Sequence, residues 1–316
     1  MAAQLTKIAA VVLPAFCAAL SSNAQACVAT LSSNGGVYAS VTAAVAAAQP
    51  VDTITINGSG GVCSENVLVD NTHLRMIITG INGATITGAT TSPTLDLRVK
   101  GVEVANLTVN GGTQGILIWR NSNAFIQNVV AQGALYQGIA VSSMGFAVIV
   151  DSTIQNNGRE GIVVYQLAAA RIGLNTWETG TVTYQPNVIQ NNGESGISVL
   201  AYSSVAIYAN TITGNGQFGY LVSAAGVSSG GNTINSNKSG GIFVGYNAVA
   251  SIGVTPSLSG PFPDQTTVSN GGYGVACFAG GFVGGHLGST NQLMGSSGQF
   301  GFDPTCPEGT TQIFVP

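Results

Sequence analysis

The sequence predicts an all-β solenoid whose coils are built from short strands. A glycine followed by an apolar-x-apolar triplet returns along the chain, most clearly in IQNNGREGIVVYQ, IQNNGESGISVLA and ITGNGQFGYLVSA. Successive triplet glycines are separated by 23, 23, 35, 23, 22, 33 and 27 residues, a period near 23 with two long intervals. Self-similarity at such a period indicates a solenoid, in which each repeat packs against its neighbours. The glycines are Gly115, Gly138, Gly161, Gly196, Gly219, Gly241, Gly274 and Gly301.

The residues that follow each glycine form columns at period two, which predicts strands with one buried face. Two isoleucine columns upstream of the glycine predict two further strands in each coil. Three strands per coil would therefore surround one apolar axis. The columns after the glycine are Ile116, Ile139, Ile162, Ile197, Tyr220, Ile242 and Val275, then Ile118, Val141, Val164, Val199, Val222, Val244 and Cys277; the upstream ones are Ile154, Ile189, Ile212 and Ile234, then Ile149, Ile172, Ile207 and Ile252.

Asparagine recurs where the coils should turn. Its side-chain amide tolerates turn conformations, and stacked amides can bond one coil to the next while satisfying the corner backbone. We therefore expect two asparagine ladders. The first is Asn157, Asn192, Asn215, Asn237 and Asn270, each four residues before a glycine; the second is Asn106, Asn128, Asn187, Asn210 and Asn232, interrupted by Ser152.

The charge content excludes some partners. Only 6% of the 316 residues are charged, with 8 Lys and Arg and a formal net charge of −4. Eight basic residues are too few for a phosphate-neutralising surface, so nucleic acid is not expected as a partner.

The first 26 residues predict a cleaved signal peptide, with Lys7, an apolar stretch and a small-residue site that ends at Ala26. A lipid on Cys27 is a minor alternative. The mature chain is then expected to be secreted, on the cell surface or periplasmic, with an N-terminal cap over 27–50 and a solenoid over 51–316. No later stretch is long enough to span a membrane.

Four cysteines remain after the signal peptide, and they allow three pairings. Their positions near the two ends of the chain favour Cys27–Cys63 and Cys277–Cys306 as structural disulfides. Because no closely spaced Cys-x-x-Cys pattern occurs, we expect no metal site, and nothing indicates a cofactor.

Two stretches carry a resemblance to a known family. YASVTAAVAAAQPVDTITI looks like an Ala-rich helix that caps an open first coil, and GGVCSENVLV looks like the segment after it. With the repeats, the chain over about 38–305 resembles the right-handed parallel β-helix proteins of the pectin-lyase-like superfamily. The repeats, counted with irregular end turns that include a C-terminal irregular coil, predict about ten coils. The resemblance implies a site on the outer face of the strands that begin at the aligned glycine.

The catalytic motifs of that superfamily's lyases, hydrolases and esterases are absent, so no catalytic residue is assigned. Glu160 and Glu194 fall in the corner before the glycine, where solvated charges are expected. The outward positions of the strands predict an exposed apolar stripe, which suggests a covered or partner-facing surface. They are Leu117, Ala140, Val163, Ser198, Leu221 and Phe243, then Trp119, Ser142, Tyr165, Leu200, Ser223 and Gly245.

Charged residues stand at the start of this stripe. Asp96, Arg98 and Lys100 are expected to point outward, one coil from Trp119 and Arg120. The simpler interpretation is a surface ion pair with Arg98 resting on the indole. The alternative is a sugar-binding platform, to which Tyr165 would add a second aromatic ring.

The two long intervals supply another candidate site. LNTWETGTVTYQPN and VTPSLSGPFPDQT insert at one corner, three coils or roughly 14 Å apart. A shallow cleft between them would be lined by Trp177, Glu178, Tyr184, Phe262 and Asp264, although plain surface loops explain the same residues.

Three functional hypotheses follow. The first is a non-enzymatic exported protein that binds a polysaccharide or another surface protein. The second is a carbohydrate-active enzyme, a lyase, hydrolase or epimerase, that lacks the known motifs. The third is a coil stack covered by another chain. Carboxylates that converge with each other, or with Arg or Lys, on one groove would favour the second.

Overall fold

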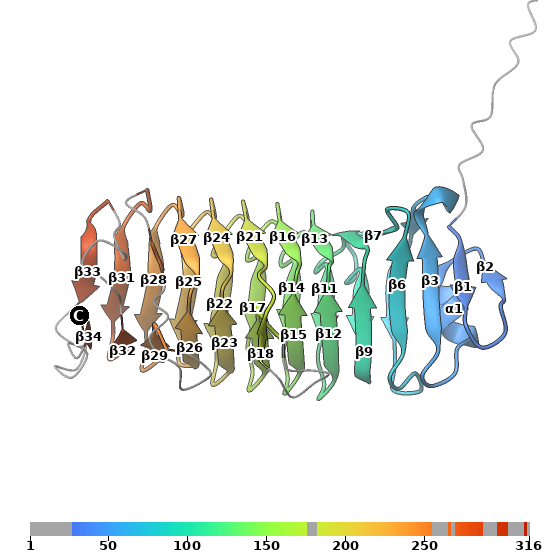
Figure 1. Ribbon diagram of the computed structural model, residues 1–316, viewed down its shortest axis with the longest axis horizontal. Coiled ribbons are helices and arrows are strands. Elements are labelled where there is room, and N and C mark those ends of the chain that lie inside the picture. The colour runs from blue at the N-terminus through green and yellow to red at the C-terminus, as the bar shows by residue number, and fades with distance from the viewer. Residues whose placement is uncertain are drawn as a thin grey trace, which may run out of the picture.

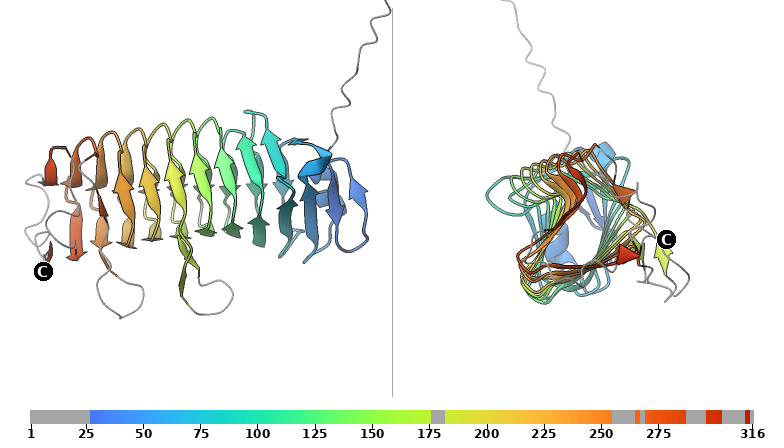
Figure 2. Two further views of the ribbon diagram at one scale, coloured as in Figure 1. Left: turned by 45° about the horizontal axis from the view of Figure 1, so that its top comes forward. Right: turned by 90° about the vertical axis from the view of Figure 1, so that its left-hand side faces the viewer.

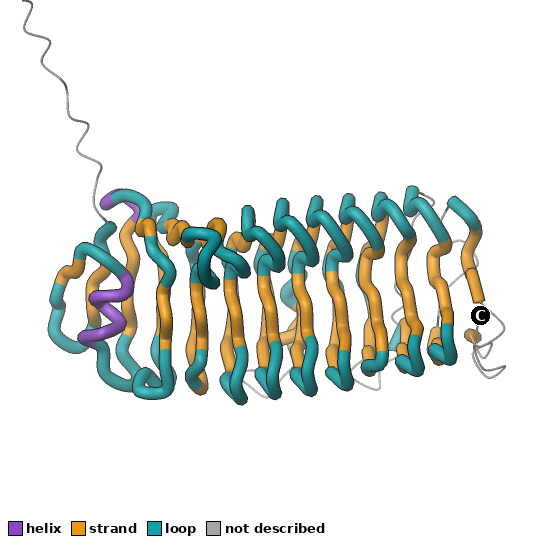
Figure 3. The backbone as a smooth tube through the Cα atoms, turned by 180° about the vertical axis from the view of Figure 1, so that it is seen from behind, coloured by secondary structure: helices purple, strands orange, loops and turns teal. Residues whose placement is uncertain are grey.

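The computed structural model describes residues 27–175, 182–254, 265–266, 269–286, 296–302 and 313–314. The chain winds along one axis as a parallel β-helix, and each coil contributes strands to three long sheets (Figures 1 and 2). The strands lie in ladders joined by short corners (Figure 3). No helix in this described part is long and apolar enough to cross a membrane.

Sheet C contains the strands that follow the aligned glycines, and it has 10 strands among the described residues. In chain order they are β5 (Val67–Val69), β8 (Leu95–Leu97), β11 (Ile116–Ile118), β14 (Ile139–Val141), β17 (Ile162–Val164), β22 (Ile197–Leu200), β25 (Phe218–Ser223), β28 (Gly240–Gly245), β31 (Tyr273–Phe278) and β33 (Gly298–Phe302).

Sheet A has 13 strands in the described ranges, parallel except at its first end. They are β1 (Ala29–Leu31), β2 (Val37–Tyr38), β3 (Thr53–Asn57), β6 (Ile77–Ile81), β9 (Lys100–Ala105), β12 (Asn123–Gln127), β15 (Phe146–Val150), β18 (Ala169–Ile172), β23 (Ser204–Tyr208), β26 (Gly226–Gly230), β29 (Val249–Ile252), β32 (Phe282–His286) and β34 (Ile313–Phe314).

Sheet B, with 9 strands in that same part of the chain, closes the coil. Its strands are β4 (Cys63–Ser64), β7 (Thr85–Gly88), β10 (Thr108–Gly111), β13 (Val130–Gln132), β16 (Thr153–Gln155), β21 (Val188–Gln190), β24 (Thr211–Thr213), β27 (Thr233–Asn235) and β30 (Gln265–Thr266).

The predicted columns are confirmed by the strand register. Ile116 pairs with Ile139, Ile139 with Ile162, and Ile162 with Ile197. These side chains are fully buried in a single core that runs the length of the axis. Burial of a β-branched side chain from every coil supplies the main driving force for folding, at roughly 1.5–3 kcal/mol per residue.

The first asparagine ladder is confirmed as a continuous hydrogen-bonded stack. Asn215 Nδ2 donates to Asn237 Oδ1 at 2.9 Å and to the Ile189 carbonyl at 3.2 Å. Its Oδ1 accepts from the backbone N–H of Asn192 at 3.2 Å and from the Asn192 amide at 3.0 Å. Each buried amide thus satisfies two backbone groups of the preceding coil and bonds to the amides of the coils on both sides.

The second ladder is shorter than predicted. Asn187, Asn210 and Asn232 are buried and stack in the same way. Asn106 and Asn128 instead lie one position earlier, exposed and in left-handed backbone, and bond to each other at 2.9 Å. At the ladder position those two coils have Leu107 and Val129, which are buried and extend the apolar core.

The N-terminal end of the axis is covered by a cap. β1 pairs antiparallel with β2 and β3, and the Ala-rich helix α1 (Val41–Ala47) packs beside them. Ser40 caps the helix by accepting from the Ala43 N–H at 3.0 Å. A 3₁₀ turn, η1 (Gly58–Gly60), precedes β4. The cap covers apolar side chains that the first coil would otherwise expose.

Both long intervals run from sheet A to sheet B. The first lies between β18 and β21 and contains the antiparallel pair β19 (Leu174–Asn175) and β20 (Thr183–Tyr184), which leaves the stack (Figure 2). The second lies between β29 and β30, and its residues 255–264 lie outside the described part.

We predict that Asn215→Ala lowers the free energy of unfolding by about 2–4 kcal/mol, because it removes the hydrogen bonds to the buried Asn192 N–H and Ile189 carbonyl and interrupts the amide stack. Thermal unfolding followed by circular dichroism measures the effect. Lys238→Ala, an exposed substitution beside the same ladder, should change stability by less than about 0.5 kcal/mol. Equal midpoints for the two variants would contradict a structural role for the ladder.

Candidate functional site

The outer face of sheet C has small, covered side chains along its central column. Along its central column Asp96 aligns with Leu117, Leu117 with Ala140, and Ala140 with Val163. Ala140, Val163 and Ser198, farther along, are each at most 4% exposed, although they point away from the core. Larger side chains at neighbouring positions, such as Tyr165 and Leu200, stand around this floor.

The predicted exposed apolar stripe is therefore wrong as a description of this face. Leu117, Leu221 and Phe243 are half-buried, and the smaller outward residues are covered by their neighbours in adjacent coils. Phe243 stacks between Phe218 and Phe278, with ring centroids 5.1 and 5.6 Å away. These side chains of the stripe pack against one another. Their packing therefore gives no reason to expect that another chain covers the stripe.

A polar cluster lies on the same outer face, near the N-terminal end of sheet C. Asp96, 8% exposed, accepts from the Trp119 indole N–H at 2.7 Å and from Arg98 Nη2 at 2.6 Å. This hydrogen bond raises the pKa of Arg98 above its ordinary value. The guanidinium carbons of Arg98 and Arg120 lie 4.8 and 4.0 Å from the centroid of the Trp119 ring. Asp96 thus fixes the indole, and the indole supports two cations.

The cluster borders a depression of about 400 Å³ whose walls come from three successive strands, β5, β8 and β11, and from the corners before them. Its lining residues are Asn66, Val67, Leu68, Ser92, Pro93, Asp96, Arg98, Gln114, Leu117 and Trp119.

Lys100 does not join this cluster, contrary to our grouping. The chain turns at the buried Val99, so Lys100 begins β9 in sheet A and pairs with Asn123. It borders a different depression, of about 660 Å³, together with Arg75 and Glu103. β8 ends at Leu97, so the two-residue alternation that placed Lys100 on the same face does not extend to it.

A second polar cluster was missed by the sequence analysis. Glu160 is 6% exposed, whereas a solvated charge was expected. Its Oε2 accepts from Gln137 Nε2 at 2.9 Å, and Gln137 Oε1 accepts from Gln114 Nε2 at 3.3 Å. These three residues each stand immediately before an aligned glycine, so a column of long polar side chains in the sequence could have revealed them.

Arg159 links Glu160 to the next coil. Its Nε lies 3.8 Å from Glu160 Oε2 and donates to Glu194 Oε1 at 2.9 Å. The hydrogen bond to Glu194 raises the pKa of Arg159. A depression of about 300 Å³ adjoins this cluster, and Tyr136 and Tyr165 line it. Gln114 lines both depressions, so they adjoin along sheet C, and we refer to them together as the groove of sheet C.

Of the residues predicted to line a cleft between the two long loops, only Tyr184 lies in the described part of the chain. Tyr184 is 40% exposed and lies with its ring centroid 6.3 Å from that of the buried Tyr208. Trp177, Glu178, Phe262 and Asp264 lie outside the described residues, so the predicted cleft between the loops stays a prediction. Tyr184 stands at the corner between sheets A and B, away from the groove of sheet C.

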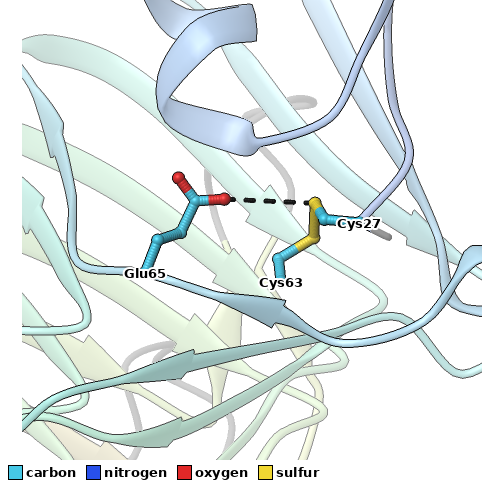
Figure 4. Close-up of side chains that lie close together, drawn as sticks. All are labelled: Cys27, Cys63 and Glu65. Atoms are coloured by element: carbon cyan, nitrogen blue, oxygen red, sulfur yellow. Dashed lines mark hydrogen bonds between the residues drawn. A yellow bond between two sulfur atoms is a disulfide. The ribbon is translucent and has the colours of Figure 1, made fainter. Parts of the chain in front are cut away.

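One group of potential metal ligands occurs in the described ranges, namely Cys27, Cys63 and Glu65 (Figure 4). The two sulfurs form the predicted disulfide, which is confirmed, and a disulfide offers no thiolate. Glu65 accepts from the backbone N–H groups of Val41 and Thr42 at 2.6 and 2.9 Å. The group therefore joins the cap to the first coils.

The disulfide also decides between the two expectations for Cys27. A lipid anchor would occupy the Cys27 sulfur, which is bonded to Cys63. The lipid alternative is therefore wrong in this structure. The second predicted pair, Cys277–Cys306, stays a prediction because Cys306 lies outside the described residues.

The geometry defines the class of protein as a parallel β-helix with a polar groove on one sheet. The family description "right handed beta helix region" matches residues 97–257. The chain belongs to this right-handed β-helix family. No curated protein matches the sequence.

Solved structures share the architecture at low identity. A mutant of the periplasmic alginate epimerase AlgG has a TM-score of 0.50 at 12% identity, over 81% of this chain and 82% of that chain. The A-module of the Azotobacter vinelandii mannuronan C-5 epimerase AlgE6 has a TM-score of 0.43 at 14% identity, over 84% and 91%. Tailspike protein 2 of an Escherichia coli O157:H7 bacteriophage has a TM-score of 0.41 at 11% identity, over 81% and 41%. These similarities concern the fold.

We predict that the double variant Cys27→Ser, Cys63→Ser loses about 3–4 kcal/mol of stability in the cap, because the disulfide closes a loop across a sequence separation of 36 residues. Hydrogen exchange should rise in β1 and α1 and stay unchanged in β14 and β17. A reducing agent should reproduce this pattern in the unmodified chain. Unchanged protection of the cap would contradict the prediction.

Proposed function

We propose that this chain is an exported protein that binds a glycan along the groove of sheet C. Export is supported by the disulfide, since disulfides persist in oxidising compartments. The predicted signal peptide, residues 1–26, lies outside the described residues.

The observation that carries the proposal is the guanidinium of Arg120 held on the Trp119 ring. Arg120 is exposed and has no ion-pair partner among the described residues, so its planar set of donors can bind a ligand. The indole is fixed by Asp96, which reduces the entropy lost on binding. A stacked arginine beside a groove suits the hydroxyl or carboxylate oxygens of a sugar.

The charges of the groove favour a neutral or sparsely charged glycan. Arg98 is paired with Asp96, and Arg159 with Glu194. Glu160 brings a further negative charge, and Arg120, which lies beside the groove on the Trp119 ring, brings a further positive one, so the fixed charges cancel. With a net charge of −4 on the whole chain, a densely anionic polymer would meet no attractive field.

We predict that Arg120→Ala weakens glycan binding about tenfold or more, because a buried or stacked Arg contact commonly contributes more than 1 kcal/mol to an interface. Isothermal titration calorimetry against neutral and acidic polysaccharides measures the affinity, and Trp119→Phe should retain part of it.

Arg171→Ala is the matched control, since Arg171 also lies over an aromatic ring, Phe146 at 5.7 Å, but on sheet A. Unchanged binding by Arg120→Ala and Trp119→Ala, with loss in Tyr184→Ala, would move the ligand to the loop site and contradict the proposal.

A second candidate function rests on Glu160. A carboxylate beside Arg159, at a groove lined by tyrosines, meets the condition that we set for a carbohydrate-active enzyme. Glu160 would act as a general acid or base, and Glu194 on the next coil would supply the second carboxylate. We rank this function second because Arg159 neutralises Glu194 and Glu160 is almost inaccessible.

Turnover separates the two functions. Polysaccharides that bind are incubated with the protein and assayed for new reducing ends and for unsaturated products. The first function predicts binding without either product. Under the second, Glu160→Gln should lower turnover at least about 100-fold while binding persists, because general acid–base catalysis contributes a factor of this order. Glu194→Gln on the adjacent coil shows whether the pair acts together.

A further inference from the structure

Another cleft lies outside the groove, at the corner where the chain passes from sheet C to sheet A. Tyr202 follows β22 and Tyr246 follows β28, and they are 79% and 60% exposed. The coil between them contributes Ala224 and Ala225. The cleft has a volume of about 400 Å³.

The coil spacing sets the width of this cleft. β22 pairs with β25, and β25 with β28, so the tyrosines stand two coils apart, Tyr202 at the second left-handed position of its corner and Tyr246 at the first. Two steps of about 4.8 Å place their backbones roughly 10 Å apart along the axis. One ring in contact with an aromatic face on each side needs about 7–8 Å between those faces. The alanines leave the intervening space open, so the cleft can accept a single six-membered ring.

The lining contains no charged side chain. It combines two phenol rings with small apolar groups and with the polar side chains of Ser203 and Asn247. Sugar rings present C–H faces that pack on aromatic rings and a rim of hydroxyl groups that need hydrogen bonds. This composition suits an uncharged sugar.

An independent observation concerns Ser203, whose hydroxyl group lacks a hydrogen-bond partner among the residues that the structure describes. It is 2% exposed and lines the cleft, and its Oγ is the one buried side-chain polar atom in the described residues without a hydrogen-bond partner. Buried hydroxyl groups are normally hydrogen-bonded. Ser203 therefore contributes to the lining of the cleft a residue whose hydroxyl group makes no hydrogen bond within the described part of the chain.

The backbone at the two tyrosines shows that the fold does not require them. Tyr202 has φ of 63° and Tyr246 has φ of 56°, both in the left-handed region that favours Gly and Asn. Other coils have Asn121, Met144, Leu167 and Gly280 at the position of Tyr202, and Gln166, Ala201 and Ala279 at the position of Tyr246, all with positive φ. The corner therefore accepts many residue types, and the fold does not require a tyrosine at either position.

We infer that this cleft binds one residue of a neutral saccharide between Tyr202 and Tyr246. The cleft begins three coils beyond Trp119 and Arg120 along the axis, and it stands whether or not the groove binds glycan.

The test uses neutral hexasaccharides of glucose, mannose and xylose with the full mature chain. Saturation-transfer NMR identifies the sugar that binds, and calorimetry measures its affinity. The double variant Tyr202→Ala, Tyr246→Ala should lower the affinity at least tenfold. Met144→Ala, which removes another exposed apolar residue in left-handed backbone at the same corner, should leave it unchanged. All variants are compared in a Trp119→Ala, Arg120→Ala background, in which the groove should no longer bind, so the affinity measured there belongs to this cleft.

The stability readout separates binding from folding. Tyr202→Asn suits the left-handed backbone, so its thermal midpoint should equal or exceed that of the unmodified chain while its affinity falls. Binding of no neutral hexasaccharide in the Trp119→Ala, Arg120→Ala background, or binding there that survives the double tyrosine substitution, overturns the inference. Dimerisation that depends on the tyrosines, seen by analytical ultracentrifugation without saccharide binding, overturns it as well by assigning the cleft to a contact between copies.

Discussion

Each coil of this protein completes the hydrogen bonds of its buried backbone on the coil beside it. Parallel strands do this along the sheets, and the asparagine stack does it at a corner, where the backbone turns away from the ladder. An unpaired buried amide is costly, so a coil cannot shift by one residue without leaving several such groups exposed to the core. Register is therefore fixed first, and the positions of all outward side chains follow from it.

Strict register copies each outward position about every 4.8 Å along the axis. Charges repeated at that spacing would repel one another, which accounts for a chain with only 6% charged residues. Candidate binding sites then arise where one coil has a different type of residue from the other coils at the same outward position. Asp96 stands in a column that continues as leucine, alanine and valine, and Glu160 follows two glutamines. Tyr202 and Tyr246 flank a coil that has alanine at their corner.

The sequence predicted the features that depend on strand register. It did not predict features at corners, where the number of residues between successive strands changes from coil to coil. The buried columns and the Asn157 ladder could be found because identical residues repeat at one interval. Asn106 and Asn128 fit the interval within one residue, yet that residue moves them out of the buried ladder. Lys100 fails for the same reason, since the turn at Val99 places it on another sheet. The burial of Glu160 depends on side chains of adjacent coils, which no single repeat contains.

The same spacing limits the chemistry that the groove can perform. Two carboxylates that cleave a glycosidic bond stand about 5–10 Å apart, which in a β-helix means the same coil or coils one or two steps apart. Asp96 and Glu160 are three steps apart through β8, β11, β14 and β17, or roughly 14 Å, so they cannot form a pair. Glu160 and Glu194 stand on adjacent coils, but Arg159 lies between them and bonds to Glu194. The guanidinium holds in place the carboxylate that a second step would need, and this arrangement favours recognition of a sugar over its cleavage.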